Sequence, residues 1–100
     1  MLHTVNKSPF ERNTLDSCLR LAKKGSAILL IEDGVIAAAK GTAQSSKLEG
    51  ALGDHDVFVL GPDLKARGLS EDQVIDGIKI VDYSGFVDLA EERGTVNSWL

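Results

Sequence analysis

Short aliphatic runs alternate with helix-like segments along the chain, and this alternation constrains the fold more than any other feature of the sequence. An uninterrupted aliphatic run is typical of a strand buried on both faces of a parallel sheet. Turn residues and then an amphipathic stretch follow each run, which predicts βαβ units. The predicted strands are Leu2–Val5, Ala27–Ile31, Val57–Leu60, Ile78–Val81 and a candidate fifth, Val96–Leu100.

Helix start and stop signals lie between these strands. Serine followed three residues later by Glu or Gln indicates a capping box, and glycine after an amphipathic stretch indicates a helix end. Ser8 and Ser70 fit the capping box, and Ser84 is interpreted as the cap of the last helix. The expected segments are a turn at Ser8–Glu11, helices at Thr14–Lys24, Ala43–Leu52 and Pro62–Gly68, a turn at Ser70–Gln73, and a last helix from Ser84 to Gly94.

These elements predict a small three-layer α/β domain spanning residues 1–100, with four or five mostly parallel strands. Of the residues, 43% are hydrophobic and 26% charged, which fits one water-soluble domain. The longest apolar runs, Ala27–Ile31 and Val35–Ala39, are far shorter than the roughly 20 residues of a membrane span. With no signal-peptide pattern at the start, a cytoplasmic protein without membrane contact is expected.

The charge balance argues against direct nucleic-acid binding. Fifteen acidic and eleven basic residues leave a formal charge of -4, whereas phosphate neutralisation needs clustered cations. No glycine-rich phosphate loop is present, and three of the four loops after the main strands carry carboxylates, which repel phosphate. A nucleotide site is therefore disfavoured, and no cofactor is expected.

Several polar residues in these loops have plain structural explanations. Glu32 and Asp33 are interpreted as a solvated turn in which Gly34 takes a positive φ. Asp63 suits the first turn of a helix, where the dipole favours an anion. His3 lies in a predicted strand as a structural histidine, and His55 is expected in a surface loop.

Cys18 is the only thiol, so an internal disulfide is excluded, and with His3 and His55 as the only other soft ligands no metal site is expected. In the first predicted helix it shares the core-facing stripe of Leu15, Leu19 and Ala22. Its helical neighbours carry no positive charge that would promote a thiolate. Two interpretations stay open: Cys18 fills the core, or it reacts.

Four segments in order resemble the DsrH/TusB family. The opening Leu-His-Thr with the later Ser-Pro, an Ile-Glu-Asp-Gly-Val stretch, an Asp-Leu-x-Ala-Arg-Gly stretch, and Asp-Tyr with a terminal Trp span nearly the whole chain. These segments are Met1–Phe10, Ile31–Val35, Leu60–Gly68 and Asp82–Leu89 with Trp99. Cys18 and the third segment are most similar to the DsrH branch, which is found in sulfur-oxidising bacteria.

The resemblance implies a flavodoxin-like fold and the smallest subunit of a DsrEFH-type sulfurtransferase complex. Such a heterohexamer contains DsrE/TusD-like and DsrF/TusC-like subunits and relays sulfur as a cysteine persulfide. In the Dsr branch the sulfur passes to a DsrC-type acceptor during oxidation of stored sulfur. In the Tus branch a TusE-like acceptor leads to 2-thiolation of the tRNA wobble uridine. The DsrH-like motifs favour oxidation here, with the Tus branch as the alternative.

The same resemblance places the main persulfide cysteine on the DsrE/TusD-like partner, which leaves the catalytic status of this chain open. Cys18 matches a cysteine of DsrH proteins and is therefore a candidate accessory persulfide site. The apolar segment from Gly34 to Ala39 suits either core packing or contact with another subunit. A stand-alone binding domain of flavodoxin-like form is the remaining alternative, although a fold alone does not license a function.

Overall fold

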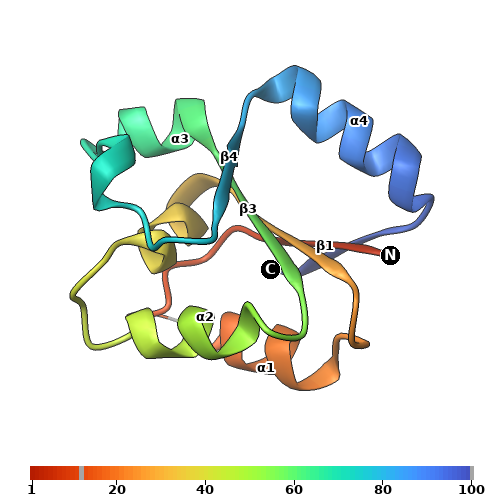
Figure 1. Ribbon diagram of the computed structural model, residues 1–100, viewed down its shortest axis with the longest axis horizontal. Coiled ribbons are helices and arrows are strands. Elements are labelled where there is room, and N and C mark those ends of the chain that lie inside the picture. Colours follow the sequence, from red (N-terminus) through yellow and green to blue (C-terminus); the bar gives the residue numbers. More distant parts are fainter. Residues whose placement is uncertain (12, 100) are drawn as a thin grey trace.

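The computed structural model describes residues 1–11 and 13–99 and arranges them around a sheet of five parallel strands (Figure 1). Across the sheet the strands are β4 (Lys79–Val81), β3 (Asp56–Leu60), β2 (Ala27–Leu30), β1 (Leu2–Val5) and β5 (Val96–Trp99). The expected α/β class and parallel sheet are confirmed. The candidate fifth strand is real as far as Trp99, and Leu100 lies outside the described residues.

Burial explains why the aliphatic runs become strands. All four residues of β2 are fully buried, because β2 is the middle strand and helices lie over both of its faces. Its register places Ile28 between His3 of β1 and Val57 of β3. Residues that alternate along these strands point to opposite faces, so each face has a separate hydrophobic cluster.

The helices are distributed unevenly over the two faces of the sheet. Leu15, Leu48 and Leu64 from three different helices join one cluster, whereas the other cluster receives its helical residues from the last helix, around Leu89. In Figure 1 the helices of residues 14–21 and 45–51 lie below the sheet and the last helix lies above it. The helical segments are α1 (Thr14–Leu21), η1 (Glu32–Ala38), α2 (Ser45–Ala51), α3 (Gly61–Ala66), η2 (Glu71–Gln73) and α4 (Tyr83–Arg93).

The strand order accounts for this distribution. From β1 to β4 the chain moves steadily across the sheet in one direction, so right-handed crossovers place the intervening helices on one face. From β4 to β5 it returns in the opposite direction, so the same handedness places α4 on the other face. The three-layer arrangement is therefore confirmed, with one layer formed by a single helix.

The predicted helices at Ala43–Leu52 and Pro62–Gly68 are Ser45–Ala51 and Gly61–Ala66, and two further boundary differences have clear causes. The helix predicted to reach Lys24 ends at Leu21, because Ala22 is extended with ψ 134°, and Gly25 (φ 89°) lies in the turn beyond. Ser84 does not cap the last helix. Asp82 does so, because its Oδ1 accepts a hydrogen bond of 2.8 Å from the Gly85 N–H.

Other helix signals are confirmed. The capping box at Ser70 and Gln73 is formed, and Gly94 ends α4 with φ 77°. Ser8 caps a turn, since its hydroxyl accepts from the Phe10 N–H at 3.2 Å. Among residues 1–11 and 13–99, no helix has both the length and the apolar character needed to cross a bilayer.

Candidate functional site

Hydrogen bonds join the segment that follows β2 to the segment that follows β3 at the carboxyl edge of the sheet. Oδ2 of Asp63, in the first turn of α3, accepts a hydrogen bond of 2.6 Å from the Glu32 N–H at the start of η1. The Arg67 guanidinium donates to Oδ1 of Asp33 through Nη2 at 3.0 Å and Nε at 3.2 Å. Asp33 and Asp63 thus connect two parts of the chain, and neither needs a ligand to explain its position.

Gly34 is essential at this edge for a reason that the sequence prediction missed. The predicted positive φ at Gly34 is wrong: the left-handed residue is Glu32, with φ 50°. A Cβ at Gly34 would lie 2.1 Å from the carbonyl oxygen of Val5, at the end of β1. The residue is therefore glycine because η1 passes directly against the backbone of β1, not because of its own dihedral angles.

The apolar segment after Gly34 packs inside the chain. Val35, Ala37 and Ala38 are almost completely buried and belong to the cluster beneath α1 and α2. Its far end is tied to the segment before β4, because the Ile75 N–H donates to the Ala38 carbonyl at 2.8 Å. Of the two interpretations of this segment, the structure supports core packing.

Cys18 lies on the inner face of α1 and has no exposed surface. It belongs to the larger hydrophobic cluster, and burial raises the pKa of its thiol to about 12. A neutral thiol without solvent access is a poor nucleophile, so this geometry agrees with core filling. The accessory persulfide role of Cys18 stays a prediction.

His3 is confirmed as a structural histidine in β1. Its Nδ1 accepts a hydrogen bond of 3.0 Å from Nε1 of Trp99, and only 4% of the residue is exposed. Burial lowers the pKa of His3, and the positive charge of the chain's amino terminus and His55 lower it further. Since Nδ1 is an acceptor here, the neutral imidazole carries its proton on Nε2.

The surface position predicted for His55 is wrong. The residue is only 9% exposed, and its backbone N–H donates to the Ala51 carbonyl at the end of α2, at 2.9 Å. None of the described residues offers a hydrogen-bond partner to its buried Nδ1.

A cavity of about 540 Å³ opens between the end of α1 and the edge strand β5. Sequence reasoning missed it, because its residues come from β1, β5 and the turn after α1. His3 and Asn97 are directly opposed in the β1–β5 register, and Trp99 lies two residues further along β5. The lining residues are Met1, His3, Leu21, Lys23, Ser26, Asn97 and Trp99.

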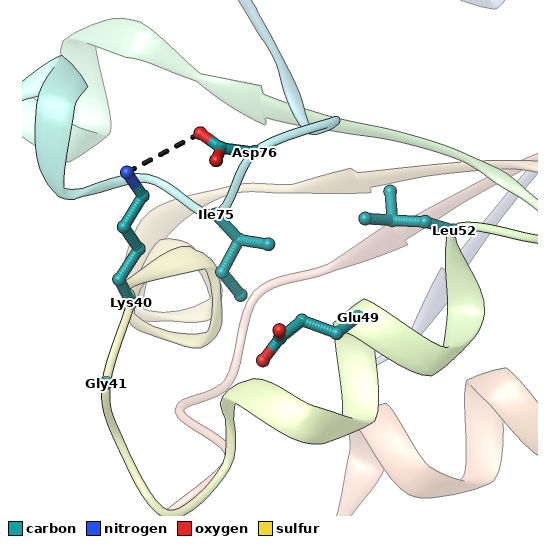
Figure 2. Close-up of a pocket in the computed structure, with 6 residues that line it drawn as sticks. All are labelled: Lys40, Gly41, Glu49, Leu52, Ile75 and Asp76. Carbon is teal, nitrogen blue, oxygen red and sulfur yellow. Dashed lines mark ion pairs between the residues drawn. The ribbon is translucent and has the colours of Figure 1, made fainter.

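A second cavity, of about 390 Å³, lies between α2, the segment that follows η1 and the segment that follows η2. Figure 2 shows the residues that line it. Lys40 forms an ion pair of 3.5 Å with Asp76 across its mouth. Glu49 of α2 and the apolar side chains of Leu52 and Ile75 complete the wall. Charges of both signs compensate one another here, and nothing in the lining selects a particular ligand.

Among the described residues, no group of side chains converges in the way a catalytic site requires. The family is therefore established by similarity to known proteins. The family described as DsrH like protein matches residues 7–96. The chain belongs to this family. Relatives called Protein TusB from Pectobacterium parmentieri, Erwinia tasmaniensis and Escherichia coli are 37%, 40% and 36% identical to it. Each match covers 99% of this chain and 100% of the relative.

Solved structures support the fold of this DsrH-like chain. The ychN protein of Escherichia coli superposes with a TM-score of 0.79 over 97% of both chains, at 19% identity. A protein of unknown function from Methanobacterium thermoautotrophicum gives a TM-score of 0.72 at 14% identity and covers 97% of this chain and 96% of its own. These similarities show a shared fold, and family membership itself implies a subunit of a sulfur-relay system.

The resemblance read from the four sequence segments is therefore confirmed. Two of those segments, Ile31–Val35 and Leu60–Gly68, contain the residues that lock together at the carboxyl edge, so part of the family signature has a structural explanation. The partners that pair across these loops lie more than 30 positions apart, and no local sequence signal indicates such a contact.

Proposed function

We propose that this chain is the small, mainly architectural subunit of a sulfur-relay complex. Membership of the DsrH-like family over residues 7–96 supports a sulfur-relay role. The full burial of Cys18, the only thiol, carries the architectural part of the proposal. A chain with no accessible thiol holds or positions a partner's persulfide and does not bear the main one itself.

The expected partners are a DsrE/TusD-like subunit, which carries the principal persulfide cysteine, and a DsrF/TusC-like subunit. Together they would form a cytoplasmic heterohexamer with two copies of each chain. A DsrC/TusE-like protein would then accept the sulfur. The small subunit would contribute surface and order to this assembly, and its thiol would take no obligatory part in the transfer.

The named relatives favour the tRNA branch over the oxidation of stored sulfur. Full-length similarity to proteins called TusB supports delivery of sulfur toward 2-thiolation of the tRNA wobble uridine. Oxidation toward a DsrC-type acceptor is the second candidate, because the matching family is described as DsrH like. The resemblance of Cys18 to a cysteine of DsrH proteins also favours it.

Co-expression tests the proposal directly. The chain is produced with the DsrE/TusD-like and DsrF/TusC-like proteins of its own genome, and the mixture is analysed by size-exclusion chromatography. Co-elution of all three is expected, and a stable monomer with affinity for neither protein would refute the proposal. Deletion of the gene then separates the branches: loss of 2-thiouridine from tRNA supports the Tus branch, and unchanged tRNA with impaired sulfur oxidation supports the Dsr branch.

An accessory persulfide on Cys18 is a separate hypothesis that requires the thiol to become exposed during assembly. Mass spectrometry of the assembled complex after treatment with a sulfane-sulfur donor tests it. One additional sulfur on Cys18 would support the hypothesis. A loaded partner cysteine beside an unmodified Cys18 would contradict it and leave the architectural role intact.

A further inference from the structure

We propose that the cavity between α1 and β5 binds a small organic monoanion with a flat apolar body, of the class of the arylalkanoic acids. This inference is independent of the proposed function, because it concerns the isolated chain. The cavity volume of about 540 Å³ lies within the range of ordinary small-molecule sites.

The position of the cavity follows from the strand order. β5 pairs with β1 alone, so it forms one edge of the sheet. α1 ends at Leu21, and the chain then turns through Lys23 toward Ser26 and β2. The side chains of His3, Asn97 and Trp99 are therefore left facing a space that α1 borders but does not fill.

The polar side chains that line this space favour an anion. His3 has its Nδ1 occupied by Trp99, which leaves an N–H at Nε2 as its donor. The Ser26 hydroxyl and the Lys23 ammonium add further donors. Among the described residues no carboxylate side chain lines the cavity, although the chain as a whole carries a charge of -4. His3 and Ser26 are also buried, with 4% and 6% exposure, so these two polar groups are held in place by the fold.

The apolar lining favours a ligand with a flat hydrocarbon part. Met1 and Leu21 are 50% and 63% exposed, and both border the cavity. The indole of Trp99 provides an aromatic wall. A ring placed against these three side chains would remove apolar surface from water, and its carboxylate would meet the donors described above.

Trp99 is the only tryptophan, so its fluorescence reports on this cavity alone. The full chain is titrated with phenylacetate, with the neutral phenylacetamide and with the cationic benzylamine. Phenylacetate is expected to give a saturable change, with an affinity roughly tenfold or more above that of the amide, because only the anion forms charge-assisted hydrogen bonds. Benzylamine is expected to bind more weakly still.

Neighbouring lysines provide a matched pair of variants. Lys23→Met is expected to weaken phenylacetate binding several-fold, and Ser26→Ala to weaken it also. Lys24→Met should have no effect, because Lys24 is outside the lining and pairs with Asp54 at 3.5 Å. Equal affinities for the acid and the amide, equal effects of the two lysine variants, or no saturable signal would overturn the proposal. So would a Trp99 response that appears only when partner subunits are added, since that would make the cavity a protein interface.

Discussion

The Glu32 N–H donates to the Asp63 carboxylate across 31 positions of sequence, at 2.6 Å. Glu32 is the only described residue other than glycine with a positive φ, so this bond holds the chain at a point where the backbone is strained. It also joins the loop after β2 to the first turn of α3. The resulting clamp aligns the carboxyl ends of two neighbouring strands.

Removal of this clamp should lower stability measurably. Asp63→Ala leaves the Glu32 N–H without its partner, and the free energy of unfolding should fall by about 1 kcal/mol, since the bond is accessible to water. Asp63→Asn keeps an oxygen acceptor and should lose less. Urea denaturation followed by circular dichroism measures both. Equal stability of the alanine variant and the parent would show that the clamp is not energetically important.

Gly34→Ala should lower the stability of the fold strongly, although it adds only one methyl group. The added methyl group would lie 2.1 Å from the Val5 carbonyl oxygen, so η1 and β1 would have to separate. We expect a loss of about 3 kcal/mol or failure to fold. Gly50→Ala is the control, because a Cβ there meets no atom within 4 Å and α2 should gain about 0.5–1 kcal/mol. Similar thermal midpoints for the two variants would contradict this account of η1.

The sequence alone predicts the sheet well because burial on both faces leaves a strong local signal. Ala27–Leu30 is entirely aliphatic and is the fully buried central strand. Contacts between segments far apart in the chain leave no comparable pattern in the local sequence. Nothing near Asp63 indicates its bond to Glu32, and nothing near His3 indicates Trp99, because each pair is brought together by strand order.

Errors in the local predictions have equally specific causes. Aspartate competes with serine as a helix cap, so Asp82 begins α4 where Ser84 was expected. His55 is flanked by two aspartates and resembles a loop residue, but its backbone is tied to the end of α2 and its side chain is buried. The cavity beside β5 depends on the uncovered edge of the sheet, which periodicity does not describe.

Cys18 should be nearly inert in the native protein. With a thiol pKa of about 12, about one thiol in ten thousand is ionised at pH 8, and the side chain has no exposed surface. An aromatic disulfide reagent should therefore react at least about 100-fold more slowly with the native chain than with the chain in concentrated urea. Comparable rates in the two states would show that the thiol is accessible and would favour a reactive role.

The same shift predicts a loss of stability in alkali. The pKa of the Cys18 thiol rises from its ordinary value of 9.0 to about 12 on folding, so its contribution to stability is complete below pH 9 and is lost between pH 9 and 12. The stability difference between the parent and Cys18→Ala should stay constant from pH 7 to 8.5 and shrink above pH 9. A difference that does not change up to pH 10.5 would contradict the burial of this thiol.

His3 should make the fold sensitive to mild acid. Its pKa in the folded state lies below the ordinary 6.5, so the stability it contributes is present above that value and is lost as the pH falls through the folded pKa. Protonation of Nδ1 would also break the bond from Trp99. The unfolding free energy, followed by Trp99 fluorescence between pH 7 and 5, should decrease by up to about 1.4 kcal/mol per pH unit. In His3→Gln this dependence should be largely absent, and an unchanged slope would assign it to another group.

The pairing of β5 with β1 has a consequence for synthesis of the chain. Leu2 lies opposite Val96, so the outer edge of β1 has no neighbour until β5 has been made. During translation the four earlier strands can associate while that edge stays open to any extended segment nearby. Closure of this edge depends on β5, and among its described residues only Trp99 reaches the larger core cluster. Until β5 pairs, a neighbouring extended polypeptide can therefore occupy its place beside β1.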